Sequence, residues 1–292
     1  MFAYRHREYK AGRTIEVIET YPGNCGRGLT REKYKGVTPP AMARYNEKMQ
    51  VHKLTRLINA NFIPDDLFIT LHYNRQDRPT PETAKAQLSA FLRKLKALYK
   101  KNGGELKYIK VSAYGSKGGI HHHIVVNNIG LNFDLITALW KFSTRKPDFT
   151  PLYDNGEYSA LAAYLIKQSK ITKYNAQVLT GRTYSGSHNL KQPELIKDEY
   201  IERIKWNEPP KAKKGYLIDT DSIEAGINEL TGKPYLFYRM IKEIAADKET
   251  RCKSRADNRQ EVKKRWGAIA PLGDIVFKKE LTKGNKNQAE KS

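Results

Sequence analysis

The stretch KYIKVSAYGSKGGIHHHIVVNN, residues 107–128, contains two apolar, largely β-branched runs on either side of a glycine-rich turn. Runs of this kind predict β-strands, here over residues 106–113 and 120–127. Two strands joined by so short a turn are most simply an antiparallel hairpin. We therefore expect this hairpin to lie within an antiparallel sheet.

Three consecutive histidines lie in the second of these strands. Because alternate side chains of a strand share a face, His121 and His123 point to one side and His122 to the other. Two imidazoles on one face can converge on a metal ion such as Mn²⁺, Zn²⁺, Cu²⁺ or Ni²⁺, whereas Mg²⁺ prefers oxygen ligands. The alternative is that the histidines only cover the sheet surface.

The segments around the hairpin alternate between strand and helix patterns. Thr80 and Pro81 predict the start of a helix that the NGG at 102–104 ends, with apolar residues at helical spacing between them. The other predicted elements are a strand at 66–73, a helix at 134–142, a strand or extended loop at 148–154 and a helix at 156–174. This order predicts an α+β fold in which helices pack on one face of an antiparallel sheet.

Composition predicts three parts of the chain: a basic N-terminal arm and helix (1–60), a central domain (61–238) and a charged, basic, helical or partly disordered tail (239–292). After residue 180 the signals weaken, and GYLIDTDSI and PYLFYRM predict at most a strand and a short segment. The arm ends in a predicted amphipathic helix at 41–59, with the basic side chains Arg44, Lys48, Lys53 and Arg56. This basic face is either a solvated surface or a DNA contact.

The charge of the chain points to a polyanionic partner. Lys and Arg number 53 against 31 acidic residues, a formal net charge of +22. Such an excess repels itself unless it meets a polyanion, for which nucleic acid is the default. The chain also has 18 tyrosines, which can stack on bases. A merely soluble, lysine-rich surface is the less favoured interpretation.

Several classes of protein are disfavoured by the remaining composition. The two cysteines, Cys25 and Cys252, are too few for a disulfide framework or a multi-cysteine zinc site, which fits a reducing cytoplasm. No apolar run approaches the roughly 18 residues that a membrane span needs. The start MFAYRHREYK lacks the apolar core of a signal peptide. We therefore expect a cytoplasmic protein that does not enter a membrane.

A second group of residues with catalytic potential lies on the predicted helix 156–174. Tyr164 and Lys167 are three residues apart and therefore share a face of that helix. A tyrosine phenolate can attack phosphorus to form a phosphotyrosine, and a lysine can stabilise the charge that develops there. Such a pair occurs by chance on many helices, but after a His-x-His strand in so basic a chain it is a specific signal.

Three strings in this order, FITLHY, IHHHIVVN and YLIK, resemble the three motifs of HUH endonucleases, in particular single-tyrosine rolling-circle replication initiators of small plasmids and filamentous-type phages. The likeness covers roughly residues 37–240. It implies an HUH or RRM-like palm, with His121 and His123 binding a divalent metal, Mn²⁺ or Mg²⁺. It also implies that Tyr164 is the nucleophile and Lys167 its helical partner.

The same resemblance implies an activity and partners. The enzyme would nick and rejoin DNA at an origin through a covalent 5′-phosphotyrosine, acting on single-stranded or hairpin DNA in a bacterial cytoplasm. A host helicase and polymerase would separate and copy the strands. Further basic residues expected to contact DNA are Lys117, Lys170, Lys173 and Lys191.

One residue departs from the pattern. Relatives of this type generally carry a glutamate before the glycine-rich turn, in a string like VTEYG, whereas this chain reads VSAYG with Ala113 at that position. If that glutamate is a third metal ligand, then Ser112, His72, Asp77 or water would have to replace it. Otherwise Ala113 marks an inactive or engineered form.

Two alternatives to a replication initiator remain at this stage. The first is a catalytically impaired DNA-binding protein that keeps the fold, which Ala113 supports and the retained tyrosine, lysine and histidines oppose. The second is a related transposase or relaxase. Relaxases usually place the tyrosine before the histidines, and this chain has the opposite order.

Overall fold

The computed structural model describes residues 4–22, 40–115, 118–153, 155–174, 183–205, 208–229, 231–244, 249–250 and 252–269, with the side chains of 170–174 left aside. The chain divides into two compact units. The terminal unit comprises Met1–Tyr45 and Glu194–Ser292, and the histidine unit comprises Asn46–Pro193. Within the described ranges, no helix is long and apolar enough to cross a membrane.

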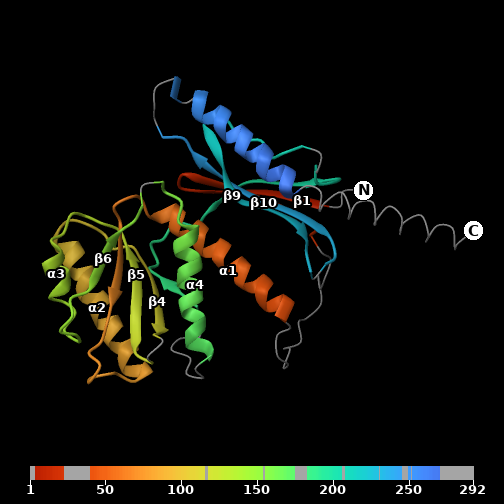
Figure 1. Ribbon diagram of the computed structural model, residues 1–292. Helices are drawn as coiled ribbons and strands as arrows, with labels where there is room; N and C mark the ends of the chain where they lie inside the picture. The colour runs from red at the N-terminus through yellow and green to blue at the C-terminus, as the bar shows by residue number, and fades with distance from the viewer. Residues whose placement is uncertain are drawn as a thin grey trace, which may run out of the picture. The chain divides into compact units, whose positions relative to one another are not determined.

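The histidine unit is built on a five-stranded antiparallel sheet with the strand order β6-β3-β5-β4-β7 (Figure 1). Its strands are β3 (Leu67–Leu71), β4 (Tyr108–Tyr114), β5 (Ile120–Val126), β6 (Asp148–Pro151) and β7 (Ser185–Gly186). The predicted hairpin is confirmed as β4 and β5, and both other predicted strands of this region are present. β5 lies in the middle of the sheet, which places the histidines between two neighbouring strands.

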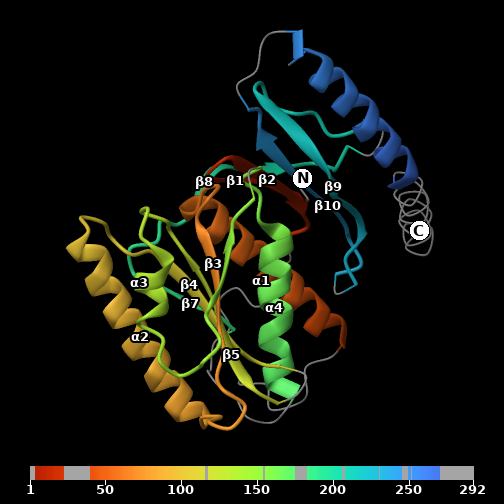
Figure 2. The ribbon, with the colours of Figure 1, turned by 60° about the vertical axis from the view of Figure 1, so that its left-hand side comes forward.

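Helices cover both faces of this sheet (Figure 2). The helices are α1 (Pro40–Asn61), α2 (Pro81–Lys101), α3 (Phe133–Thr137) and α4 (Ser159–Tyr174). α2 packs on one face, whereas α4 and the buried part of α1 pack on the other. The predicted covering of one face is therefore wrong. The reason is visible in β5, where the successive residues Ile124 and Val125 point to opposite faces and are both fully buried.

One predicted helix is shorter than expected. The prediction placed a helix at 134–142, but α3 ends at Thr137. Trp140 instead leaves the helical path and packs in the core beside Phe91, with its indole nitrogen donating to the carbonyl of His72 at 2.7 Å. Tertiary packing of the tryptophan thus outweighs local helix propensity.

The terminal unit contains a second five-stranded antiparallel sheet, in the order β8-β1-β2-β10-β9 (Figure 1). Its strands are β1 (Tyr4–Ala11), β2 (Thr14–Thr20), β8 (Glu194–Ile201), β9 (Tyr216–Ile227) and β10 (Pro234–Lys242). A helix at 252–269 packs on this sheet, with Val262 and Trp266 buried against Ile15 and Met240. The α+β class and the antiparallel sheet with packed helices are therefore confirmed.

The structure divides the chain differently from the prediction. Residues 4–20 are a β-hairpin rather than part of a basic arm, and residues 194–238 share their sheet with that hairpin rather than with the histidines. The predicted tail provides the end of β10 and a packed helix, while 270–292 lie outside the described residues. The charges that suggested an arm and a tail are partly buried, as in the pair of Glu16 and Arg239, whose atoms lie 3.0 Å apart.

Candidate active site

The three histidines of β5 lie on two faces of the sheet. His122 is 1 % exposed and faces α2, where its Nδ1 lies 2.7 Å from the hydroxyl of Ser112 and its Nε2 lies 3.0 Å from that of Tyr73. Burial lowers its pKa to about 3, assisted by the neighbouring histidines and Lys110. His122 is therefore a neutral core residue, and the other two histidines share the opposite face.

His121 and His123 face the side of the sheet that α4 covers, with ring centroids 4.7 Å apart. His123 is 3 % exposed and stacks on Phe68 at a centroid distance of 5.3 Å. Its Nδ1 lies 3.2 Å from the hydroxyl of Thr70, and its Nε2 lies 3.4 Å from the hydroxyl of Tyr164. Burial lowers the pKa of His123 to about 3 and lowers that of His121. Both rings are thus neutral near pH 7.

α4 presents Tyr164 to this pair. The tyrosine is 41 % exposed, so that water reaches its ring, and partial burial raises the pKa of its hydroxyl. Lys167 is also exposed one turn further along α4, and no hydrogen bond or ion pair joins it to another described residue. The helix therefore brings Tyr164 to the histidines, while Lys167 stands outside the side chains that line the cavity described next.

The two histidines and Tyr164 line an open cavity of ≈ 660 Å³. Its opposite wall includes His72, whose Nε2 lies 3.0 Å from a carboxylate oxygen of Asp148 and whose ring stacks 6.2 Å from that of His121. Arg145 donates to both oxygens of Asp148, at 3.0 and 2.8 Å. Burial opposes ionisation of Asp148, but these two hydrogen-bond partners outweigh it and lower the pKa of the carboxyl.

Three arginines in the cavity wall were not predicted from the sequence: Arg75, Arg78 and Arg145. The side chain of Arg78 lies over the turn before β5, where a Cβ added to Gly119 would meet its Nε at 3.6 Å. One signal was available. β3 ends, β5 begins and β6 begins at the same edge of the sheet, because β3 is antiparallel to both. Basic residues flanking those strand ends therefore gather around the histidines.

The position of the missing glutamate is defined by the strand register. Ala113 is fully buried and pairs directly with His121 across β4 and β5, so both side chains share a face. Ser112 points to the other face, which removes it as a ligand, and Asp77 is bound by Asn74 and does not line the cavity. His72 remains on the correct side. Among the described residues, no three His, Cys, Asp or Glu side chains form a group that could hold a metal ion.

The residues predicted to contact DNA lie away from this cavity. Lys53 and Lys191 are exposed, Lys48 and Arg56 are half-buried, and Arg44 is bound to Glu229 at 2.6 Å within the terminal unit. Lys117 lies outside the described residues, as do the side chains of Lys170 and Lys173 on α4. The structure thus does not bring these cations together with Tyr164.

Comparison with known proteins supports a class of protein, namely a replication initiator. Residues 66–172 match the family model of the replication-associated protein ORF2. The matched segment runs from just before β3 into α4 and contains His121, His123 and Tyr164. No curated protein and no solved structure matches the chain.

Proposed function

We propose that the protein nicks and rejoins DNA at a replication origin through a covalent 5′-phosphotyrosine at Tyr164, and so starts rolling-circle replication of a plasmid or phage. One observation carries the proposal. The hydroxyl of Tyr164 lies 3.4 Å from a buried, neutral His123 in a cavity that is also lined by arginines. This combines a nucleophile, a group that orients it and cations that attract a phosphodiester.

In the proposed reaction the phenolic oxygen of Tyr164 attacks the scissile phosphorus. The bond between phosphorus and the 3′ oxygen breaks, the enzyme stays joined to the 5′ phosphate, and the 3′ oxygen takes up a proton to become a hydroxyl. Because the pKa of Tyr164 is raised, its hydroxyl is protonated near pH 7 and releases its proton to water at its exposed edge. The reverse attack by a 3′ hydroxyl rejoins the strand and regenerates the tyrosine.

The remaining side chains of the cavity would bind and orient the phosphate. Arg75 and Arg78 would neutralise its charge from the wall opposite the tyrosine, since a guanidinium matches two phosphate oxygens. Asp148 fixes His72 and Arg145 through hydrogen bonds, which keeps this wall in one arrangement. A single strand, opened by a host helicase or extruded as a hairpin, would fit such a site better than a paired duplex, because the phosphate must reach a half-buried tyrosine.

The side chains fit a metal ion only in part. His121 and His123 offer two imidazoles on one face, whereas catalytic zinc sites, for comparison, use three protein ligands. An Mn²⁺ or Mg²⁺ ion held by these two residues would act as a Lewis acid on the phosphate, with water filling the other positions. The steps above are assigned to the chain's own residues.

A second candidate function is DNA binding without cleavage. Ala113 favours it, because the register places alanine directly beside His121 where a carboxylate would complete an ion site. The position of Tyr164 against His123 favours the nicking enzyme. The two candidates make different predictions for a covalent product.

The test is an adduct assay. Labelled single-stranded origin DNA is incubated with the protein and Mn²⁺ or Mg²⁺, and a protein–DNA adduct is sought on a denaturing gel. We expect an adduct with the wild type and with Tyr153→Phe, a control at a tyrosine that is 44 % exposed in the same unit. Tyr164→Phe should form none.

Three outcomes would contradict parts of the proposal. An adduct that persists in Tyr164→Phe would refute the nucleophile. Full activity in EDTA would remove the ion from the reaction. DNA binding without an adduct under any condition would favour the second candidate.

A further inference from the structure

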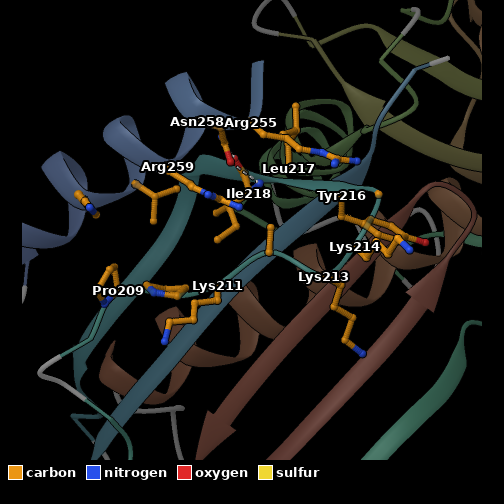
Figure 3. Close-up of a pocket in the computed structure, with 15 residues that line it drawn as sticks. Pro209, Lys211, Lys213, Lys214, Tyr216, Leu217, Ile218, Arg255, Asn258 and Arg259 are labelled. Atoms are coloured by element: carbon orange, nitrogen blue, oxygen red, sulfur yellow. Dashed lines mark hydrogen bonds between the residues drawn. The ribbon is translucent and has the colours of Figure 1, made fainter. Parts of the chain in front are cut away.

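The terminal unit contains a basic cavity that the proposed nicking reaction does not use. It has a volume of ≈ 580 Å³ and lies between the segment 209–218 and the helix 252–269 (Figure 3). Its lining contains six cationic side chains and no acidic one. The cations are Lys211, Lys213, Lys214, Arg255, Arg259 and Lys263.

Half of these cations are held by carboxylates outside the lining. The pairs are Lys211 with Glu208, Lys213 with Glu8, and Arg255 with Glu243. Lys214, Arg259 and Lys263 are exposed, and no hydrogen bond or ion pair joins them to another described residue. The cavity therefore carries three positive charges that nothing in the described part of the chain neutralises.

The helix holds its share of these cations in a row. Arg255, Arg259 and Lys263 are spaced by four residues and so lie along one face over about 12 Å. Asn258 fixes the helix to β9, accepting from the amide nitrogen of Ile218 at 3.0 Å and donating to its carbonyl at 2.8 Å (Figure 3). The row is thus anchored to the sheet and does not depend on the helix alone.

Charge on this helix is segregated. The acidic Asp257 and Glu261 line a different hollow, together with Lys253, and neither borders the basic cavity. A solvated helix face would be expected to mix the two signs. The separation leaves a surface of one sign, which is the arrangement that attracts a polyanion.

We propose that this cavity binds the sugar–phosphate backbone of double-stranded DNA. A row of about 12 Å corresponds to three or four steps of a strand that rises about 3.4 Å per base pair. Single-strand sites usually combine cations with several aromatic platforms, but Tyr216 is the one aromatic residue in this lining. The lining thus suits phosphate contacts without base stacking, which position a duplex without reading its sequence.

The test compares two triple variants with the same change of charge. Lys214→Ala, Arg259→Ala and Lys263→Ala remove the unpaired cations of the cavity. Lys253→Ala, Lys264→Ala and Arg265→Ala remove two lysines and one arginine from exposed positions of the same helix outside the lining. Both are made in the full chain carrying Tyr164→Phe, so that binding is measured without cleavage and does not depend on the proposed nicking. Circular dichroism and melting temperature confirm that each variant is folded.

Fluorescence anisotropy with a duplex and with a single strand of equal length provides the readout. We expect the cavity variant to bind duplex about tenfold more weakly and its log–log salt slope to fall by about 2 to 3, since each lost phosphate contact contributes about 0.9. The control triple should change duplex affinity by about twofold or less. Arg259→Glu, a single change at an exposed side chain, should lower duplex affinity in the same direction.

Two results would overturn the inference. Equal losses in both triple variants would show that net charge alone is felt. An equal or larger loss for the single strand would assign the cavity to single-stranded DNA.

Discussion

Replacing Ala113 by glutamate should turn the histidine face into a tighter ion site. Ala113 pairs directly with His121 in the register of β4 and β5. Side chains opposite each other in an antiparallel pair have Cβ atoms about 4.5–5.5 Å apart, within reach of a glutamate carboxylate. A carboxylate is also the ligand type that Mn²⁺ and Mg²⁺ prefer. The variant Ala113→Glu should therefore bind such an ion more tightly than the wild type.

The expected size of the effect follows from burial and linkage. Because Ala113 is fully buried, an uncompensated carboxylate there should destabilise the metal-free protein by about 1–3 kcal/mol. An ion present at about 100 times its dissociation constant returns about 2.7 kcal/mol. For a unit of this size 1 kcal/mol corresponds to about 2–4 °C, so Mn²⁺ should raise the melting temperature of the variant by about 5–10 °C.

The assay is thermal unfolding of the wild type, Ala113→Glu and Ala113→Gln, each in EDTA and in Mn²⁺. Glutamine has the shape of glutamate without its charge, so it separates the effect of a ligand from the effect of a larger side chain. Adduct yield on origin DNA is a second readout and should rise in Ala113→Glu. If Mn²⁺ stabilises all three proteins equally, or none of them, position 113 is not beside an ion site and the reasoning from register fails.

Three further predictions concern residues whose partners the structure defines. The hydrogen bond to Glu19 raises the pKa of His6, so its stabilising contribution is complete below the ordinary value of about 6.5 and lost as the pH rises through the raised value; melting curves should show this alkaline loss in the wild type and not in His6→Gln. Arg239→Met should destabilise the terminal unit by about 3–5 kcal/mol in urea unfolding, because it leaves the fully buried Glu16 without its guanidinium, and adding Glu16→Leu should recover part of that loss. His122→Leu should cost about 1–3 kcal/mol, measured by hydrogen exchange of β5, because two buried hydroxyls lose the ring nitrogens that they contact.

The elements that could be predicted are those whose signals are local. α2 runs from Pro81 to Lys101 as expected, because Thr80 caps it, accepting from the amide of Thr83 at 3.3 Å. The β4–β5 hairpin was equally clear, since its two runs are β-branched and separated only by a glycine-rich turn. In both cases a few neighbouring residues determine the structure.

The terminal sheet could not be predicted because its order depends on distant partners. β2 pairs with β10, more than two hundred residues further along the chain, and β1 pairs with β8. Its strands also bury charged residues such as Glu8, 4 % exposed, which a composition-based prediction assigns to solvent. The ion pairs that make such burial tolerable exist only in the folded sheet.

The candidate site was predictable to the same extent. The relation between His121 and His123 follows from strand alternation, but their approach to Tyr164 depends on how α4 packs on the sheet. Arg78 and Arg145 stand in loops on either side of strands, where no periodic pattern marks them. Their contribution follows only from strand ends meeting at one edge.

The charge state of the histidine face bears on the choice between cleavage and binding alone. His123 stacks on Phe68 and is 3 % exposed, and the resulting low pKa leaves it uncharged near neutral pH. A surface that only held DNA would gain from cations at this point, since phosphate contacts provide most of its affinity. A neutral imidazole contributes no such attraction, but it keeps a nitrogen lone pair for an ion or for the hydroxyl of Tyr164. Neutral rings beside the tyrosine, with Arg75 and Arg78 on the opposite wall, therefore favour phosphoryl transfer over binding alone.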